Sequence, residues 1–338
     1  MPVLRPRVSL RSYNTFGLEA TARWWMSLES EKEAVEFLVD NFHQYPNLHI
    51  LGGGSNILLT QDIKGLVVKN DLKGLQVVRE DDRYVWLEIG AGENWHHTVL
   101  YCLDRGWGGI ENLSLIPGSV GAAPMQNIGA YGVELESVFE HLEAIHLPSG
   151  NIRRFDRKAC EFGYRSSVFK HRLKHQYMIT RVCLRLHKKH ELITHYGAIE
   201  QGLAALEGPV GIREVSQVVC DIRRSKLPDP AEIGNSGSFF KNPIISPEAF
   251  VPLHQTHPDI PHYPQADGQI KLAAGWLIQE AGWKGYRKGD AGVHARQALV
   301  LVNYGEAKGS EILQLSQDIQ ASVQSTFGVA LEREVNVW

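Results

Sequence analysis

A long run of small residues limits what this chain can fold into more than any other part of its sequence. Residues 116–132 read IPGSVGAAPMQNIGAYG, so the backbone there can lie against a flat or extended ligand. Loops of this length are uncommon in compact domains and usually carry function. We therefore expect a binding loop at 116–132, with a purely structural loop as the alternative.

A second glycine-rich segment follows a short apolar stretch that predicts a strand. It reads GGGSN and comprises Gly52, Gly53, Gly54, Ser55 and Asn56. Glycine permits positive φ and the close approach of a ligand, and successive backbone N–H groups can form a nest that binds phosphate. A tight turn between strands is the alternative for this segment alone. The segment is neither a Walker loop nor a Rossmann GxGxxG.

Two glycine-rich loops in one chain can hold a pyrophosphate from two sides. A dinucleotide such as FAD fits that arrangement better than a mononucleotide does, so we expect FAD as the ligand. The loop at residues 52–56 contains no histidine, and we therefore expect the flavin to be bound noncovalently.

Charge and composition exclude several other classes of protein. The 338 residues predict about two domains and carry a net charge of −3, which gives no bulk attraction for nucleic acid or anionic membranes. No apolar run approaches the length of a membrane span, and the N-terminus lacks the apolar core of a signal peptide. Cys102, Cys160, Cys183 and Cys220 are widely spaced, which predicts reduced and mostly buried thiols in a cytosolic protein. The histidines have no HExxH pattern and no Cys partner, so we expect no metal site.

Apolar periodicity and capping residues predict both helices and strands. Ser30 and Asn94 can each cap a predicted helix. The predicted helices span residues 31–42, 94–105, 215–222, 271–281 and 310–327. The predicted strands span residues 48–50, 65–69, 75–79, 84–89, 142–147, 178–186 and 331–337. Neither proline of residues 227–230 can continue a helix, so we place a domain boundary there.

An ordered set of motifs resembles the UDP-N-acetylenolpyruvoylglucosamine reductase (MurB) family of flavoenzymes. Any one of these motifs is weak, whereas the whole set in this order is specific. The tyrosine-glycine pair at Tyr196 also resembles the type I members of that family. The matching segments are residues 14–17 (NTFG), 51–56 (LGGGSN), 116–132, 164–170 (YRSSVFK), 226–230 (KLPDP), 234–243 (GNSGSFFKNP), 271–278 (KLAAGWLI), 294–303 (HARQALVLVN) and 331–335 (LEREV).

The resemblance implies an α+β fold. A two-lobed FAD-binding domain of the vanillyl-alcohol-oxidase (PCMH) type is expected at residues 1–226, with lobes at 1–70 and 71–226. A C-terminal α+β substrate-binding domain is expected at 227–328. The last segment, 329–338, is expected to be a strand that contributes to the active site.

The resemblance also implies an activity. The expected enzyme is a UDP-N-acetylmuramate dehydrogenase, which uses FAD and the co-substrate NADPH to reduce UDP-N-acetylglucosamine enolpyruvate in peptidoglycan precursor synthesis. Such an enzyme serves cell wall biogenesis, cell shape and cell division from the cytoplasm. Its expected partners are the UDP-sugar and NADPH, with no nucleic acid, no membrane and no obligate protein partner.

The family motifs carry over a set of residues expected to contact the flavin. Most lie in the two glycine-rich loops, and Arg223 is expected near the flavin ring, where a cation favours the reduced, anionic form. The set comprises Gly52, Gly53, Gly54, Ser55, Asn56, Pro117, Gly118, Ser119, Gly121, Ala122, Asn127, Gly129, Tyr131, Gly132 and Arg223.

Two of three expected catalytic residues have clear chemical roles. Arg165 is expected to hold the substrate carboxylate, because its planar guanidinium suits bidentate binding. Ser238 is expected to donate a proton, since even a weakly acidic hydroxyl can protonate an enolate held in contact with it. A surface ion pair for Arg165 and a turn or cap role for Ser238 are the structural alternatives.

Glu334, the third candidate, lies in the predicted final strand. Alternation there places Val335 and Val337 on one face and Glu332 and Glu334 on the other. By the resemblance, Glu334 orients the hydride acceptor or assists protonation, whereas an exposed strand glutamate is the structural alternative. The family often has Arg where this chain has Asn336.

Four further residues are expected to contact the substrate or the nicotinamide phosphates: Tyr196, Lys226, Asn242 and Lys271. Two other functions remain open at this point. One is another flavin oxidoreductase of the same fold, such as a sugar oxidase. The other is a flavin-binding module without catalysis.

Overall fold

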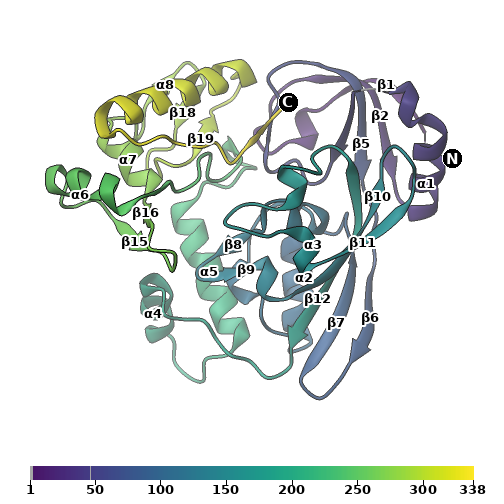
Figure 1. Cartoon of the computed structure of the whole chain (residues 1–338), viewed down its shortest axis with the longest axis horizontal. Coiled ribbons are helices and arrows are strands. Elements are labelled where there is room, and N and C mark those ends of the chain that lie inside the picture. Colours follow the sequence, from purple (N-terminus) through teal and green to yellow (C-terminus); the bar gives the residue numbers. More distant parts are fainter. Residues whose placement is uncertain (1–2, 46) are drawn as a thin grey trace. The chain divides into compact units, whose positions relative to one another are not determined.

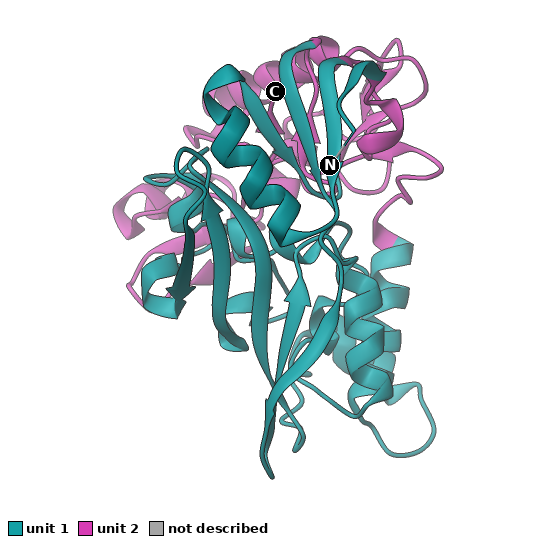
Figure 2. Cartoon of the chain, turned by 90° about the vertical axis from the view of Figure 1, so that its right-hand side faces the viewer, with its two compact units in different colours: residues 1–8, 22–54, 63–225 teal, residues 9–21, 55–62, 226–338 magenta. Residues whose placement is uncertain are grey.

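A computed structural model describes residues 3–45 and 47–338 of the chain. The chain forms two compact units, coloured teal and magenta in Figure 2. Unit 1 comprises Met1–Val8, Ala22–Gly54 and Ile63–Ser225. Unit 2 comprises Ser9–Thr21, Ser55–Asp62 and Lys226–Trp338. Unit 2 thus takes up two N-terminal segments, whereas the sequence prediction keeps all of residues 1–226 in one domain.

The first sheet of unit 1 has four strands in the order β1-β2-β5-β3. These strands are β1 (Arg5–Ser9), β2 (Thr21–Leu28), β5 (Ile63–Asn70) and β3 (Leu48–Leu51). Strands β2 and β3 both pair with β5 in parallel. Helix α1 (Glu31–Asn41) begins after Ser30, whose hydroxyl accepts a hydrogen bond from the Glu33 amide, as a capping serine does. Its residues Ala34 and Leu38 share one apolar core with β2 and β5.

The second sheet of unit 1 has five strands in the order β11-β10-β12-β7-β6, all paired antiparallel (Figure 1). The strands are β11 (Ile152–Asp156), β10 (Phe139–His146), β12 (Tyr177–His187), β7 (Tyr84–Gly90) and β6 (Leu75–Glu80). Helix α2 (Trp95–Asp104), capped by Asn94, packs on this sheet through Trp95 and Val99. The second sheet has its own large core, while Ile145 of β10 and Met178 of β12 also join the core that contains helix α1. Helices and sheets of both kinds give unit 1 an α+β fold.

Short turns and helices complete unit 1. The 3-10 turns are η2 (Phe42–Gln44), η3 (Glu111–Leu113), η4 (Val120–Ala122), η5 (Pro124–Gln126), η6 (Leu135–Ser137) and η7 (Val168–Lys170). The remaining elements are β8 (Gly129–Ala130), β9 (Val133–Glu134), α3 (Arg157–Cys160), α4 (Gly197–Ala204) and α5 (Ile212–Lys226). Helices α4 and α5 pack through Ile199, Leu203 and Val215. The expected loop at 116–132 contains the 3-10 turns η4 and η5 and the short strand β8.

Unit 2 contains a four-stranded and a three-stranded sheet, in the orders β13-β19-β18-β17 and β14-β16-β15. Their strands are β13 (Gly234–Asn235), β19 (Leu301–Asn303), β18 (Ala291–Val293), β17 (Arg287–Lys288), β14 (Ile244–Ile245), β16 (Ile270–Leu272) and β15 (His262–Pro264). The helical elements are η1 (Arg11–Tyr13), α6 (Pro247–Thr256), α7 (Ala274–Glu280) and α8 (Gly309–Phe327). Helix α8 matches the helix predicted at 310–327, and its apolar residues Ile312, Leu315, Ile319 and Val323 are buried.

The prediction of one helix over residues 271–281 is wrong at its start. Lys271 lies in β16, where it pairs with Ile244 on one side and Tyr263 on the other. The helix begins only at Ala274, whose amide donates to the side-chain oxygen of Asn242 at 3.0 Å. Pairing on both edges of β16 therefore overrides the helical spacing of the apolar residues.

The prediction of a continuous final strand is also wrong. Only β20 (Asn336–Val337) is regular, and it pairs in parallel with β4 (Ile57–Leu58). Val335 and Val337 were expected on one face, but Val335 is buried and Val337 is 40% exposed. Upstream, the chain makes a single bridge between Phe240 and Arg333. Two different neighbours, one after the other, break the strict alternation expected from a single sheet.

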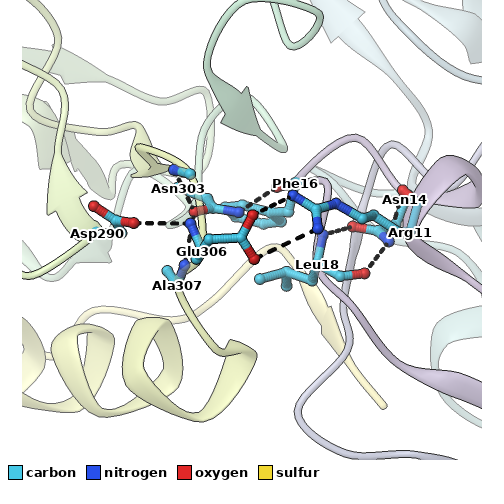
Figure 3. Close-up of polar contacts among 9 residues, drawn as sticks. Arg11, Asn14, Phe16, Leu18, Asp290, Asn303, Glu306 and Ala307 are labelled. Atoms are coloured by element: carbon cyan, nitrogen blue, oxygen red, sulfur yellow. Dashed lines mark hydrogen bonds and ion pairs between the residues drawn. The ribbon is translucent and has the colours of Figure 1, made fainter.

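Hydrogen bonds connect residues 10–18 of unit 2 to residues 303–306 of the same unit (Figure 3). We call this set of contacts the polar joint. The Asn14 amide donates to the carbonyls of Leu10 and Leu18, and its oxygen accepts from the Leu18 amide. The Asn303 amide donates to the Phe16 carbonyl at 2.9 Å. A Cβ on Gly234 would come within 2.1 Å of that same carbonyl oxygen. The NTFG motif therefore serves the fold of unit 2.

The four cysteines are free and buried, as the sequence predicts. Burial raises the pKa of Cys102, Cys160 and Cys183 to about 12, and raises that of Cys220 as well. These thiols are protonated and unreactive near neutral pH. In the part of the chain that the structure describes, no helix has both the length and the apolar character that a membrane crossing needs.

Candidate active site

The two glycine-rich loops meet backbone to backbone within unit 1. A Cβ on Gly53 would lie 2.7 Å from the Cα of Gly118, and a Cβ on Gly52 would lie 2.5 Å from the hydroxyl of Ser119. Gly118 has φ of +122° and Gly54 has φ of +65°, which side chains other than glycine rarely adopt. Only glycines permit this approach.

Backbone donors at the meeting point are available for a ligand. Among residues 3–45 and 47–338, the amides of Gly52, Gly53, Gly118 and Ser119 donate to no acceptor. Converging unpaired amides form an anion-binding nest. The amides of Gly121 and Ala122, by contrast, donate to the carbonyls of Ala91 and Ser119. Gly121 also packs on Ala91, so these two residues shape the loop.

Asn127, another expected flavin contact, is fully buried inside the loop. Its amide nitrogen donates to Glu134 at 2.9 Å and to the Gly163 carbonyl at 3.3 Å. Its oxygen accepts from the Glu136 amide at 3.0 Å. The side chain of Asn127 therefore holds three segments of unit 1 together.

Arg165 lies in a two-residue turn, framed by reciprocal backbone bonds between Gly163 and Ser166. Its φ of +51° is uncommon for a residue with a side chain. The guanidinium donates through Nη2 to the Gly129 carbonyl, and Nη1 lies 3.9 Å from a carboxylate oxygen of Glu134. Strained backbone of this kind persists where the surroundings enforce it, often at functional sites.

Arg223 is a half-buried cation on helix α5. Its Nε donates to the Leu115 carbonyl at 3.3 Å, and it forms no ion pair with any described carboxylate. Burial lowers the pKa of Arg223, Tyr131 opposes that shift, and Arg165 adds to it. Burial likewise raises the pKa of the Tyr131 phenol. A half-buried guanidinium without a carboxylate partner is suited to an anionic ligand.

Tyr196 lies at the start of helix α4 and is 45% exposed. Its ring contacts that of Tyr131 edge-on, with 6.3 Å between centroids. A Cβ on Gly132 would come within 2.8 Å of the Tyr196 ring. The structure therefore brings Tyr196, Tyr131, Arg165 and Arg223 into one region of unit 1.

Ser238 in unit 2 follows a turn built by Asn235. The buried Asn235 amide donates to the Pro228 and Ile233 carbonyls, and its oxygen accepts from the Gly237 amide. Gly237 has φ of +71°. Within residues 3–45 and 47–338, the partly exposed Ser238 hydroxyl forms no hydrogen bond. The backbone therefore fixes the position of Ser238, and among the described residues its hydroxyl has no partner that would compete with a ligand.

Glu334 lies beside this turn in the same unit. Its amide donates to the Phe239 carbonyl at 2.9 Å, so it is bonded to the residue after Ser238. Glu332, the other glutamate of the motif, has a side chain that is 70% exposed and forms an ion pair with Lys241. The two glutamates therefore have different surroundings. The structure thus brings Ser238 and Glu334 together and directs Glu332 elsewhere.

Two asparagines fix the segment after Glu334. The Asn336 backbone and side-chain N–H groups both donate to the Asn56 carbonyl, at 3.1 and 3.0 Å. The Asn56 side chain donates to the Glu334 carbonyl at 3.4 Å. Asn336 therefore supports the backbone next to Glu334.

The expected substrate contacts of unit 2 lie in three parts of the fold. Asn242 lies between Phe240 and strand β14, and its side-chain oxygen accepts from the first amide of helix α7. Lys271 lies in strand β16, and Lys226 is exposed at the end of helix α5. Within residues 3–45 and 47–338, no group of three or more His, Cys, Asp or Glu side chains could hold a metal ion.

Known protein families match residues in both units. Residues 27–156 match an FAD binding domain, and residues 229–338 match the C-terminal domain of UDP-N-acetylenolpyruvoylglucosamine reductase. UDP-N-acetylenolpyruvoylglucosamine reductase of Amoebophilus asiaticus (strain 5a2) is 50% identical over 336 residues, covering 99% of each chain. The protein of the same name from Pseudomonas aeruginosa is 49% identical, also over 99% of each chain. The chain belongs to the UDP-N-acetylenolpyruvoylglucosamine reductase family.

A solved structure agrees with this assignment. The UDP-N-acetylenolpyruvylglucosamine reductase (MurB) of Thermus caldophilus has 25% identity and a TM-score of 0.69, with 100% of both chains covered. Membership of this family and the FAD binding domain make FAD the cofactor of the chain. Among the described residues, four loop amides have no acceptor and Arg223 has no carboxylate partner, and these donors fit the anionic pyrophosphate and the flavin.

Two residues that neighbour the expected catalytic residues were not predicted from the sequence. Glu134 contacts Arg165, and Asn235 builds the turn before Ser238. The signal for Asn235 was present, because asparagine two residues before a glycine is typical of an Asx turn. No local pattern pointed to Glu134, since its contact with Arg165 depends on how two distant loops pack.

Proposed function

We propose that this chain reduces UDP-N-acetylglucosamine enolpyruvate to UDP-N-acetylmuramate with NADPH, and that Arg165, Ser238 and Glu334 carry the chemistry. Family membership supports the reaction, because relatives about half identical span 99% of both chains. Bound FAD would supply the hydride chemistry that links NADPH to the enolpyruvyl carbon, and the two glycine-rich loops with Arg223 would hold it.

The roles of the side chains follow from the charge that develops on the substrate. Adding a hydride to one carbon of the enolpyruvyl group leaves enolate character on its neighbour, next to a carboxylate. Arg165 binds this carboxylate and stabilises the added charge. Ser238 then gives its hydroxyl proton to the neighbouring carbon, since its oxygen has no competing partner among the described residues. Glu334 orients the acceptor or assists the proton transfer.

We further propose that unit 1 binds FAD and that unit 2 supplies most of the contacts to the UDP-sugar. In unit 1, the support is the set of unpaired amides at the glycine loops. In unit 2, it is the set of Lys226, Asn242 and Lys271, with Tyr196 of unit 1 as an additional contact. The four buried free thiols are typical of a reducing compartment, so we place the enzyme in the cytoplasm.

Anaerobic spectroscopy of the purified protein tests the reaction. We expect a yellow protein that NADPH bleaches and that the enolpyruvyl sugar reoxidises in the absence of oxygen. A protein that NADPH does not bleach would be a flavin-binding module. A bleached protein that only oxygen reoxidises would be an oxidase of the same fold.

A further inference from the structure

We propose that Glu134 is a positioning residue that sets the orientation of Arg165. This inference rests on the proposed function, in which Arg165 holds the substrate carboxylate. The observation that carries it is a connected polar network of Glu134, Asn127, Gly129 and Arg165, all within unit 1.

Two different nitrogens of the Arg165 guanidinium have fixed neighbours. Nη2 donates to the Gly129 carbonyl, and Nη1 lies 3.9 Å from the Oε1 atom of Glu134. Two contacts on two nitrogens of a planar group fix its rotation as well as its position. The Arg165 side chain is 20% exposed, so the network holds it in a partly desolvated place where orientation has a strong effect.

The Glu134 carboxylate is itself held from the other side. Its Oε2 atom accepts a hydrogen bond of 2.9 Å from Asn127, which is fully buried. The same Asn127 nitrogen donates to the carbonyl of Gly163, the residue that begins the turn carrying Arg165. Asn127 therefore links the Glu134 carboxylate to the turn that carries Arg165. A shift of that turn is transmitted through Asn127 to the carboxylate.

Gly129 provides the space for this arrangement. A Cβ there would lie 2.7 Å from Nη1 of Arg165 and 2.9 Å from Cγ of Glu134. The two side chains thus close over a position that only glycine can occupy. The requirement for glycine at 129 follows from this contact without any ligand.

Glu136 offers a matched control in the same segment. Its carboxylate is 31% exposed, close to the 34% of Glu134, and it is also paired with an arginine, Arg157, at 3.5 Å. The Asn127 contact to Glu136 uses only the backbone amide, so a change of the Glu136 side chain leaves it intact. Any general effect of removing one carboxylate here should appear equally in both variants.

The test follows each half-reaction by stopped-flow absorbance in Glu134→Ala, Glu134→Gln and Glu136→Gln. We expect Glu134→Ala to slow reoxidation by the enolpyruvyl sugar about 10²-fold, the cost of a misplaced group of about 1 Å. Glu134→Gln should lose less, because its amide oxygen can still accept from Asn127. NADPH bleaching and flavin content should stay at the wild-type level in all three, and Glu136→Gln should match the wild type throughout.

A double variant separates positioning from an independent role. Once Arg165→Lys has removed the planar group, Glu134→Ala should add less than about 3-fold, since coupled residues are not additive. Losses that multiply would overturn the proposal. So would an unchanged rate of reoxidation in Glu134→Ala, or an equal fall in both half-reactions with loss of flavin.

Crystal structures of the wild type and Glu134→Ala give a readout that does not need turnover. The proposal expects the Arg165 guanidinium to leave the Gly129 carbonyl in the variant, and an unmoved guanidinium would overturn it. If the wild type itself is not reoxidised by the sugar, the proposed function fails, while these two structures still decide whether Glu134 orients Arg165.

Discussion

The glycine loops of unit 1 and the Ser238–Glu334 segment of unit 2 are built in opposite ways. In the loops, backbone meets backbone, and a single added methyl group at Gly53 would overlap Gly118. In the second segment, a backbone bond joins Glu334 to Phe239, and the Ser238 hydroxyl makes no hydrogen bond to the residues that the structure describes. Substitutions in the first region should therefore appear as lost binding, and in the second as lost rate.

The largest effect should come from Ser238→Ala. Reoxidation by the enolpyruvyl sugar should slow by roughly 10²–10⁴-fold, the contribution of a general acid. NADPH bleaching needs no proton donor at the sugar carbon and should be almost unchanged. Stopped-flow absorbance of the two half-reactions measures both rates.

The same experiment can contradict this assignment in two ways. Equal slowing of both half-reactions would mean that Ser238 supports the flavin or the fold. Wild-type rates in both would place the donor elsewhere, and Glu334 would be tested next. Unfolding midpoints provide the control, because removal of an unbonded hydroxyl should cost little stability.

Arg165→Lys should be the next most severe change. Lysine keeps the positive charge but cannot make the paired contacts of a planar guanidinium. We expect a loss of roughly 10²–10³-fold in sugar-dependent turnover, as for removal of one well-placed electrostatic donor. Steady-state kinetics with the sugar as varied substrate measures this, and near-native turnover would remove Arg165 from the carboxylate site.

Bulky residues in the loops should act on binding. Gly53→Val and Gly121→Val place side chains against Gly118 and Ala91, so we expect low flavin content and a destabilisation of about 1–3 kcal/mol from overpacking. Absorbance ratios of purified protein give the flavin content. Gly197→Ala is the matched control, since a Cβ there meets no atom within 4 Å. Full flavin content in either valine variant would contradict the loop assignment.

The smallest expected effect is a gradual loss of stability in mild acid. Burial is the main cause that lowers the pKa of His49, His96, His141, His175 and His294 below the ordinary value of 6.5. Below pH 6.5 the unfolded chain therefore binds protons that the folded chain does not, and the free energy of unfolding falls. Above that pH the contribution is complete.

Urea midpoints between pH 7.5 and 5.5 measure this trend. The most buried of the five, His294, has an Nδ1 without a partner among the described residues. His294→Gln should flatten the pH dependence slightly. A midpoint that is constant or rises on acidification would show that these histidines do not control stability in this range.

Local signals in the sequence were enough for much of the fold. Ser30 and Asn94 cap helices as predicted, because a capping side chain bonds only to its own first turn. Lys271 and Val337 were misplaced, because their conformations depend on strands brought from elsewhere in the chain. The sequence also gave no indication of helix α4, which is short and is packed by α5.

In the candidate site, too, the residues with local signals could be predicted, and those that depend on distant parts of the chain could not. Gly53 and Gly118 could be predicted from the sequence, because a glycine-rich segment by itself indicates a loop whose backbone a ligand can approach. The choice of Glu334 over Glu332 needed family motifs, and its reason became visible only in the Lys241 ion pair of Glu332. Glu134 could not be found, because nothing near it in the sequence specifies Arg165 as its neighbour.

The polar joint around Asn14 has a consequence for synthesis of the chain on the ribosome. Arg11 and its ion-pair partner Glu306 are separated by 295 positions. The Phe16 carbonyl likewise accepts its hydrogen bond from the distant Asn303. Residues 9–21 are synthesised long before Asn303 and Glu306, so they cannot take their final place until those later residues have also been made. During that interval the apolar side chains of Phe16 and Leu18 are without their core. During synthesis this segment therefore offers apolar side chains that chaperones can bind, and a truncation that removes residues 303–338 would leave the segment exposed.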